Sequence, residues 1–301
     1  MEGTAHKIAD LLRAIAGKPN PKNFTSAVIA AAGDSLRMGG DTPKLFLDLN
    51  GLPVGLYSLL TYQQCDCIHE IIVVTKKEFI PVFTEWKEQY ALDKLAQITE
   101  GGETRADSVR KGLDIISPQA KYVAIADGAR ALTTPQEIAK VCHAAWQHGC
   151  ATAARHATDT VKIGDKNAFI DQTPDRKQVW YAQTPQVFRV AVYRAAAYVA
   201  VDEGIKSTDD NQLVEHIGNP VKLVECSDEN LKITTPFDMI CARALLTART
   251  DPDSPSYMED VAAYIAVARQ KNRTDSVQPV QAETDSSSSA ASAAGTEESG
   301  T

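Results

Sequence analysis

Short apolar runs alternate with amphipathic stretches over most of the chain, from about residue 25 to 249. The strand-like runs are 26–31, 71–75, 122–126, 151–154, 221–226 and 231–233. Strands that alternate with helices predict an α/β fold with a mainly parallel sheet and helices on both faces. Ligands of such sheets bind beyond the carboxyl ends of the strands, so we expect the chemistry in the loops that follow them.

Several predicted helices begin with a recognisable capping signal. Thr134 precedes Pro135 and has Glu137 three residues later, which combines an N-cap, a proline at the first position and a capping-box carboxylate. Thr235 and Asp238 repeat the pattern. Weaker versions occur at 104–107 and 207–210.

The pattern also divides the chain. Residues 1–22 place apolar side chains at helical spacing before two prolines, which predicts an N-terminal helical extension. The main domain then covers 23–250, and within it the polar stretch 155–185 interrupts the alternation and predicts a projecting hairpin or arm. Residues 251–271 are predicted to form a linker and one further helix, the helix over 257–271. The segment 272–301 has almost no large apolar residue and is predicted to be disordered.

Charge and composition exclude some classes of protein. The net charge of −8 and the pI of about 5.3 argue against a general nucleic-acid binder, which needs a basic face. The apolar runs are far shorter than the roughly 20 residues that span a bilayer, so no membrane segment is expected. Six cysteines without a framework spacing predict reduced thiols and a cytoplasmic location.

The loop after the first strand is the first candidate for chemistry. Ala31, Ala32 and Gly33 would let backbone N–H groups approach an anion closely. Arg37 and Lys44 add a cation that can clamp phosphate oxygens and a mobile point charge. The loop matches neither common glycine-rich phosphate motif, and a tight turn with solvated charges is the alternative.

Two further candidates lie farther along the chain. Gly102, Glu103 and Ser108 surround a helix start whose N–H groups could hold an anion, although ordinary capping also explains them. Asp127 ends a predicted central strand and suits Mg²⁺ or a substrate hydroxyl. The alternative for Asp127 is a turn aspartate paired with Arg130.

The last candidates lie on the arm and before the final capped helix. Thr160, Arg176 and Thr184 suit a phosphate, and a solvated hairpin is the alternative. Lys232 lies in the predicted strand 231–233, where an exposed strand lysine is the alternative. The sequence has no clear metal-ligand cluster and no G-x-S-x-G motif, which disfavours a serine hydrolase.

Taken in order over about 26–246, these segments resemble the 2-C-methyl-D-erythritol 4-phosphate cytidylyltransferase family. The shared motifs are A-A-G…R-M-G…P-K, G-G…R…S-V, D-x-A-R, D-T-V-K, A-Q-T-P-Q, T-D-D and N-L-K-I-T-x-P-x-D. The resemblance implies a Rossmann-like nucleotidyltransferase fold. It also implies a homodimer in which the arm of one subunit completes the site of the other.

The resemblance assigns roles by matching positions. The implied CTP-binding residues are Ala31, Ala32, Gly33, Gly102, Glu103 and Ser108. The implied catalytic cations around the triphosphate are Arg37, Lys44 and Lys232. The implied substrate-binding residues are Asp127, Arg130, Thr160, Arg176 and Thr184, with Thr160 and Arg176 from the partner subunit. Mg²⁺ is the implied cofactor, with Asp127 as a candidate ligand.

In this family the substrate phosphate attacks the α-phosphate of CTP and pyrophosphate leaves. A phosphate monoester with a second pKa of about 6 is mostly deprotonated at neutral pH, so the attack needs no general base. It needs cations that reduce the repulsion between two anions and stabilise the transition state.

The chain departs from the family pattern at two places. Ser35 stands where members usually have glycine, and 126–131 reads A-D-G-A-R-A where members have H-D-A-A-R-P. Two other functions remain open: a cytidylyltransferase for ribitol 5-phosphate or another polyol phosphate, and a non-catalytic module that binds sugar nucleotides. The second would predict loss of the phosphate cations, whereas Arg37, Lys44 and Lys232 are all present.

Overall fold

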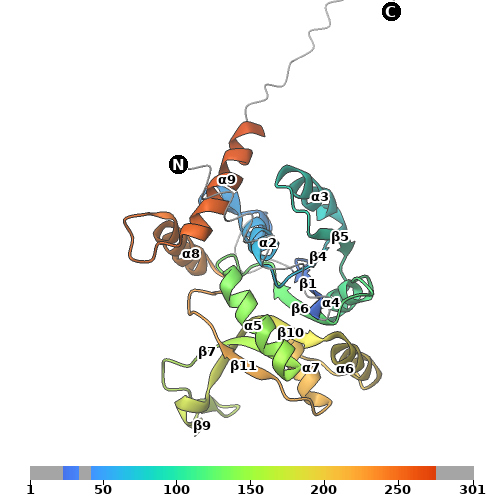
Figure 1. Ribbon diagram of the computed structural model, residues 1–301. Helices are drawn as coiled ribbons and strands as arrows, with labels where there is room; N and C mark the ends of the chain where they lie inside the picture. Colours follow the sequence, from blue (N-terminus) through green and yellow to red (C-terminus); the bar gives the residue numbers. More distant parts are fainter. Residues whose placement is uncertain (1–22, 34–41, 276–301) are drawn as a thin grey trace, which may run out of the picture.

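The computed structural model describes residues 23–33 and 42–275. They form a seven-stranded sheet in the order β11-β7-β10-β6-β1-β4-β5 (Figure 1). Its strands are β1 (Thr25–Ala30), β4 (Glu70–Thr75), β5 (Leu95–Glu100), β6 (Tyr122–Asp127), β7 (Cys150–His156), β10 (Trp180–Arg189) and β11 (Lys222–Glu225). Only β10 runs antiparallel to its neighbours in this sheet, so the predicted mainly parallel α/β fold is confirmed.

Helices cover both faces of this sheet. The helices are α2 (Val54–Gln64), α3 (Ile80–Gln89), α4 (Arg105–Asp114), α5 (Pro135–His148), α6 (Val190–Asp202), α7 (Asp210–His216), α8 (Pro236–Thr250) and α9 (Glu259–Asp275). The short 3₁₀ turns are η2 (Lys44–Phe46), η3 (Lys77–Phe79) and η4 (Arg176–Gln178). Two small hairpins complete the fold: β2 (Asp48–Leu49) with β3 (Leu52–Pro53), and β8 (Ile163–Gly164) with β9 (Ile170–Gln172).

Successive side chains of each strand point to opposite faces of the sheet, which explains why the core has two layers. Ile29 of β1 belongs to an apolar cluster with side chains of α2, α3, α5, α8 and α9, whereas the adjacent Val28 belongs to a cluster with α4, α6 and α7. Both side chains are almost fully buried. A strand buried on both faces reads as a continuous apolar run, which is why β1, β4 and β6 were the clearest signals in the sequence.

The chain order creates a crevice at the carboxyl edge of the sheet. From β1 the chain adds β4 and β5 on one side, and it then crosses back to place β6 on the other side of β1. Loops that leave β1 and β6 therefore diverge, and the point of divergence is where such sheets bind ligands.

Two predictions about elements were wrong. Residues 231–233 form no strand, because this irregular segment is pinned to the 127–130 turn by one bond from the Ile233 N–H to the Ala129 carbonyl (2.9 Å). The helix predicted over 257–271 begins at Glu259 and runs to Asp275, so 272–275 are helical rather than disordered. The Asn272 side chain, which donates to the Gly51 carbonyl, gives this end of the helix a tertiary anchor.

Part of the predicted arm belongs to the main sheet. Residues at both ends of 155–185 lie in β7 and β10, and the portion between them carries the β8–β9 hairpin. The extension 1–22, the loop 34–41 with Ser35 and Arg37, and the tail from 276 lie outside the described residues. Among the helices that the structure describes, none is both long and apolar enough to cross a bilayer.

Candidate active site

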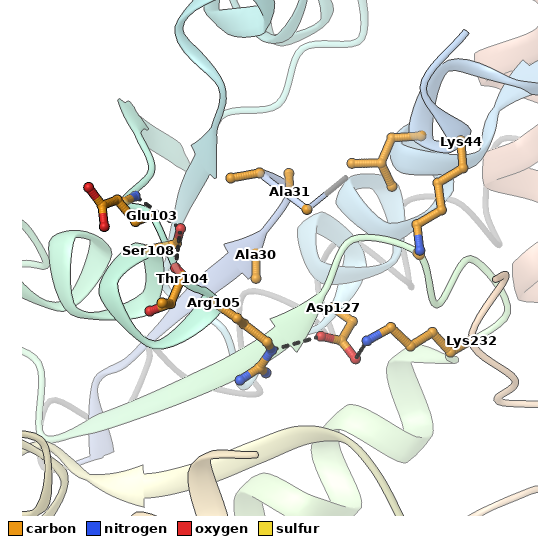
Figure 2. Close-up of a pocket in the computed structure, with 14 residues that line it drawn as sticks. Ala30, Ala31, Lys44, Glu103, Thr104, Arg105, Ser108, Asp127 and Lys232 are labelled. Carbon is orange, nitrogen blue, oxygen red and sulfur yellow. Dashed lines mark hydrogen bonds and ion pairs between the residues drawn. The ribbon is translucent and has the colours of Figure 1, made fainter. Parts of the chain in front are cut away.

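A cavity of about 300 Å³ opens at the crevice between β1 and β6 (Figure 2). Its walls come from the loop after β1, from η2, from the start of α4, from the end of β6 and from the segment before α8. Nine of the predicted site residues line it: Ala31, Ala32, Gly33, Lys44, Gly102, Glu103, Ser108, Asp127 and Lys232. Residues that are far apart in the sequence therefore share one cavity, which we call the first cavity.

A second cavity of about 260 Å³ adjoins the first. Its lining includes the predicted residues Arg130 and Thr184. Arg105, Asp127 and Lys232 line both cavities, so the two are lobes of one cleft with these side chains at the junction.

Asp127 is the electrostatic centre of this cleft. Its carboxylate lies 3.0 Å from the Lys232 Nζ, 3.3 Å from the Arg105 Nε and 3.7 Å from the Arg130 Nε. Burial alone would raise the pKa of Asp127, but the three positive charges outweigh it and hold that pKa at about 2. The three cations outnumber the two carboxylates that they contact, Asp127 and Asp210, so the junction is net positive and suited to an anion.

The turn that holds Asp127 is fixed from two sides. The Asp127 N–H donates to the Thr184 Oγ1 of β10 (3.1 Å), and the Gly128 N–H donates to the Ala30 carbonyl of β1 (3.0 Å). A Cβ at Gly128 would lie 3.3 Å from that same carbonyl, so glycine suits this close approach to β1. The alternative interpretation, a turn aspartate paired with Arg130, describes a real contact that is part of the larger charge cluster.

Arg105 is a residue of the cleft to which the sequence analysis gave no role. Its guanidinium bridges Asp127 and Asp210, with 2.6 Å between the Arg105 Nη1 and the Asp210 Oδ2. Burial would lower the pKa of Arg105, but the two carboxylates raise it above its usual value. Arg105 is the first residue of α4, where a positive charge interacts unfavourably with the helix dipole. This unfavourable position is the feature of the sequence that indicates a functional role for Arg105.

Asp210 holds the far side of this guanidinium from a buried position. Its side chain is 1% exposed, and the Tyr193 hydroxyl donates to the Asp210 Oδ1 at 2.6 Å. Burial raises the pKa of Asp210, while Arg105 and the Tyr193 hydrogen bond oppose that rise. The geometry therefore fixes Arg105 through a chain of contacts that leads into the core.

The start of α4 is packed tightly against the loop after β1. A Cβ at Gly101 would lie 2.7 Å from the Ala32 Cβ, and a Cβ at Gly102 would lie 2.3 Å from the Asp107 Cβ. Both positions therefore require glycine. The capping box of Thr104 and Asp107 is formed, so the ordinary capping expected as an alternative is present within the wall of the first cavity.

Lys232 is positioned by its neighbours rather than by a strand. Asn230, which is fully buried, donates from Nδ2 to the Thr184 carbonyl (3.0 Å) and accepts from Thr133 at Oδ1 (2.8 Å). The Asn230 carbonyl accepts from the Arg130 Nη1 at 2.6 Å. The capping box of Thr235 then fixes the other end of the segment at the start of α8.

Two of the predicted residues that the structure describes are not brought into the cleft. Thr160 and Arg176 lie on the arm and line neither cavity, and the Arg176 Nη1 donates to the Thr158 carbonyl (2.8 Å). Arg37 lies outside the described residues. Within the described part of the chain, no group of three histidine, cysteine, aspartate or glutamate side chains is arranged to hold a metal.

Comparison with known proteins agrees with this geometry. The profile of the family described as 2-C-methyl-D-erythritol 4-phosphate cytidylyltransferase matches residues 25–248. A relative with that name from Caldanaerobacter subterraneus is 41% identical over 226 residues, which cover 73% of this chain and 98% of the relative. A chloroplastic relative with the same enzyme name from Oryza sativa is 33% identical over 77% of this chain and 78% of its own length. A solved structure of 4-diphosphocytidyl-2C-methyl-D-erythritol synthase from Anaerococcus prevotii superposes with a TM-score of 0.68 at 32% identity, covering 75% of this chain and 96% of that protein.

Proposed function

The chain belongs to the 2-C-methyl-D-erythritol 4-phosphate cytidylyltransferase family, and from this premise we infer how its cleft performs the reaction. The protein is a nucleotidyltransferase that joins CTP and 2-C-methyl-D-erythritol 4-phosphate and releases pyrophosphate. We assign the site from one observation: Lys44, Lys232 and Arg105 all line the same cavity at the carboxyl edge of the sheet. These three cations come from three distant parts of the chain.

The two lobes suit the two substrates. We assign CTP to the first cavity, where 31–33, Gly102, Glu103 and Ser108 hold the cytidine and Lys44 faces the triphosphate. We assign the polyol phosphate to the second cavity, with Arg130 and Thr184 as its contacts. The junction cations then lie between the attacking phosphate and the α-phosphate of CTP.

The reaction on this assignment is an in-line displacement. An oxygen of the polyol phosphate forms a bond to the α-phosphorus, the bond to the bridging oxygen breaks, and pyrophosphate leaves. The nucleophile is already an anion near pH 7, because the second pKa of a phosphate monoester is about 6. Neither cavity has a histidine or cysteine in its described lining, in keeping with a reaction that needs positioning and charge stabilisation instead of a base.

We propose Mg²⁺ as the cofactor. Magnesium sites in such enzymes commonly use one or two carboxylates together with substrate phosphates. Asp127 fits the part of a single carboxylate, since its low pKa keeps it ionised and it lines both cavities. A bound Mg²⁺ would neutralise charge on the phosphates of CTP.

We further propose that the protein is a homodimer and is cytoplasmic. Thr160 and Arg176 on the arm would then reach the polyol phosphate in the site of the partner subunit. Exposed apolar side chains on the arm, Phe169 (72% exposed) and Ile170 (66%), support a contact with another subunit. The cysteines are free thiols, as suits a reducing compartment.

Pyrophosphate release from CTP and Mg²⁺ tests the function directly. We expect release with 2-C-methyl-D-erythritol 4-phosphate and little with ribitol 5-phosphate. The substitutions Lys44→Ala and Lys232→Ala should each lower kcat by about 10²- to 10³-fold, as for other groups that stabilise a transition state. Lys77→Ala, which removes an exposed lysine of η3, is the matched control and should leave kcat unchanged. No pyrophosphate release with either polyol phosphate would favour a non-catalytic binding module.

A further inference from the structure

Helix α9 lies beyond the part of the chain that matches the family, since that match ends at residue 248 and the helix begins at Glu259. It is nevertheless docked on the main core. Val261, Ile265 and Ala268 are each at most 2% exposed and belong to the same apolar cluster as α2 and α8. Figure 1 shows α9 beside α2 and α8, with its carboxyl end pointing away from the sheet.

The carboxyl end of α9 contacts the β2–β3 hairpin. The Asn272 Nδ2 donates to the Gly51 carbonyl at 3.1 Å, and a Cβ at Gly51 would lie 3.9 Å from the Arg269 Nε. Asn50 and Gly51 both have positive φ (53° and 93°), which is the usual Asn-Gly turn of a two-residue hairpin. The same Asn272 accepts a hydrogen bond from the Tyr90 hydroxyl at 3.3 Å, so it ties the turn to the end of α3.

This hairpin directly follows the segment that carries Lys44. The Leu47 N–H donates to the Lys44 carbonyl at 3.3 Å, and the Val54 N–H donates to the Leu47 carbonyl at 3.1 Å. The Tyr57 hydroxyl donates to the Leu49 carbonyl inside the hairpin at 2.6 Å. Lys44, the hairpin and the start of α2 are therefore one hydrogen-bonded unit, which packs against α9 at its turn.

We propose that α9, acting through Asn272, positions Lys44 in the first cavity. The helix holds the β2–β3 turn, and the hairpin transmits that constraint to η2. Asn272 is a positioning residue, because it lines neither of the two cavities of the cleft. The inference rests on the proposed role of Lys44 in binding the CTP triphosphate.

The alternative hypothesis, that α9 has only a structural role, predicts a different result. If α9 only stabilises the fold, loss of one of its contacts lowers the melting temperature and leaves the affinity for CTP unchanged. If α9 positions Lys44, loss of the contact to the turn weakens CTP binding, while the KM for the polyol phosphate stays constant because that substrate lies in the other lobe.

The test uses full-length Asn272→Ala with Gln136→Ala as its matched control. Both substitutions remove an amide that bonds across the α9 interface, but Gln136 contacts Asp260 at the opposite end of the helix (3.5 Å). Isothermal titration with CTP and Mg²⁺ should give about threefold to tenfold weaker binding for Asn272→Ala, the range for one hydrogen bond. Gln136→Ala should bind CTP as the wild type does.

The same titration in the Lys44→Ala background completes the experiment. Because Asn272 acts through Lys44, Asn272→Ala should weaken CTP binding no further once that lysine is gone. An additive effect, or wild-type affinity in the single Asn272→Ala variant, overturns the inference and leaves the proposed function intact. Failure of the wild-type protein to bind CTP would overturn both.

Discussion

Asp127 links the charge of the cleft to the stability of the fold. Its native pKa of about 2 lies below the ordinary value of 3.8. A carboxyl with a depressed pKa contributes stability that is complete above pH 4 and is lost as the pH falls toward 2. A shift of this size corresponds to about 2 kcal/mol.

We therefore expect the free energies of unfolding of the wild type and Asp127→Asn to differ most near neutral pH. The difference should shrink by about 2 kcal/mol between pH 4 and pH 2, because the wild-type carboxyl becomes neutral there as well. Urea denaturation at a series of pH values measures it. A difference that stays constant across this range would show that the three cations do not lower the pKa of Asp127.

Asp210 is expected to control the orientation of Arg105 without contacting the substrates. Asp210→Asn keeps an oxygen acceptor but removes the charge that faces the guanidinium, and a hydrogen bond between charged groups is worth about 1.5–3 kcal/mol. Steady-state kinetics should show kcat/KM lower by about tenfold or more. Tyr193→Phe, which removes only the hydroxyl that supports Asp210, should have a smaller effect. Wild-type kinetics in Asp210→Asn would contradict this role.

The sequence identified the residues of the cleft that lie in recognisable local patterns and missed those defined by distant partners. Lys44 follows a glycine-rich loop and Lys232 precedes a capping box, and the structure brings both to one cavity. Arg105 depends on Asp210, which is 105 positions away, and Asn230 depends on Thr133, 97 positions away. No local pattern reports a pair of that separation.

At the scale of elements, the starts of helices can be predicted from local patterns, whereas the pairing of strands depends on distant residues. Capping boxes involve residues three positions apart, and those of α4, α5 and α8 all form as expected. The strands β5 and β10 were not predicted, since β5 is an edge strand with a single buried side chain and β10 contains Pro185. Residues 231–233 have the composition of a strand, but a strand needs a ladder of backbone bonds, and the bond from the Ile233 N–H to the Ala129 carbonyl does not form one.

The Thr235 cap is expected to matter for both stability and activity. Thr235→Ala removes the acceptor for the Asp238 N–H and should destabilise the protein by about 0.5–2 kcal/mol in urea denaturation. It also loosens the segment that carries Lys232, so kcat should fall several-fold. Thr134→Ala removes the equivalent cap of α5 and should cost similar stability while changing kcat less than twofold. Equal kinetic effects of the two substitutions would mean that the cap of α8 does not position Lys232.

At the scale of the whole molecule, the parallel core and its crevice follow from the alternation of strands and helices, whereas the contacts of the arm do not. In one chain the arm extends from the sheet with exposed apolar side chains, and Arg176 lies outside the cleft. A sequence pattern predicts that such an arm projects, but it contains no information on what the arm packs against. The proposed homodimer gives Arg176 a role that a single subunit does not.

Mixing two inactive variants tests this arrangement. In a dimer with shared sites, each site takes Lys44 from one subunit and Arg176 from the other, so Lys44→Ala and Arg176→Ala are each inactive alone. A mixed dimer has one site with both substitutions and one site with neither. Random exchange of equal amounts makes half of the dimers mixed, and the activity should recover to about a quarter of the wild-type value. Mixing that restores no activity, under conditions where light scattering shows subunit exchange between dimers, would place Arg176 outside the partner's site.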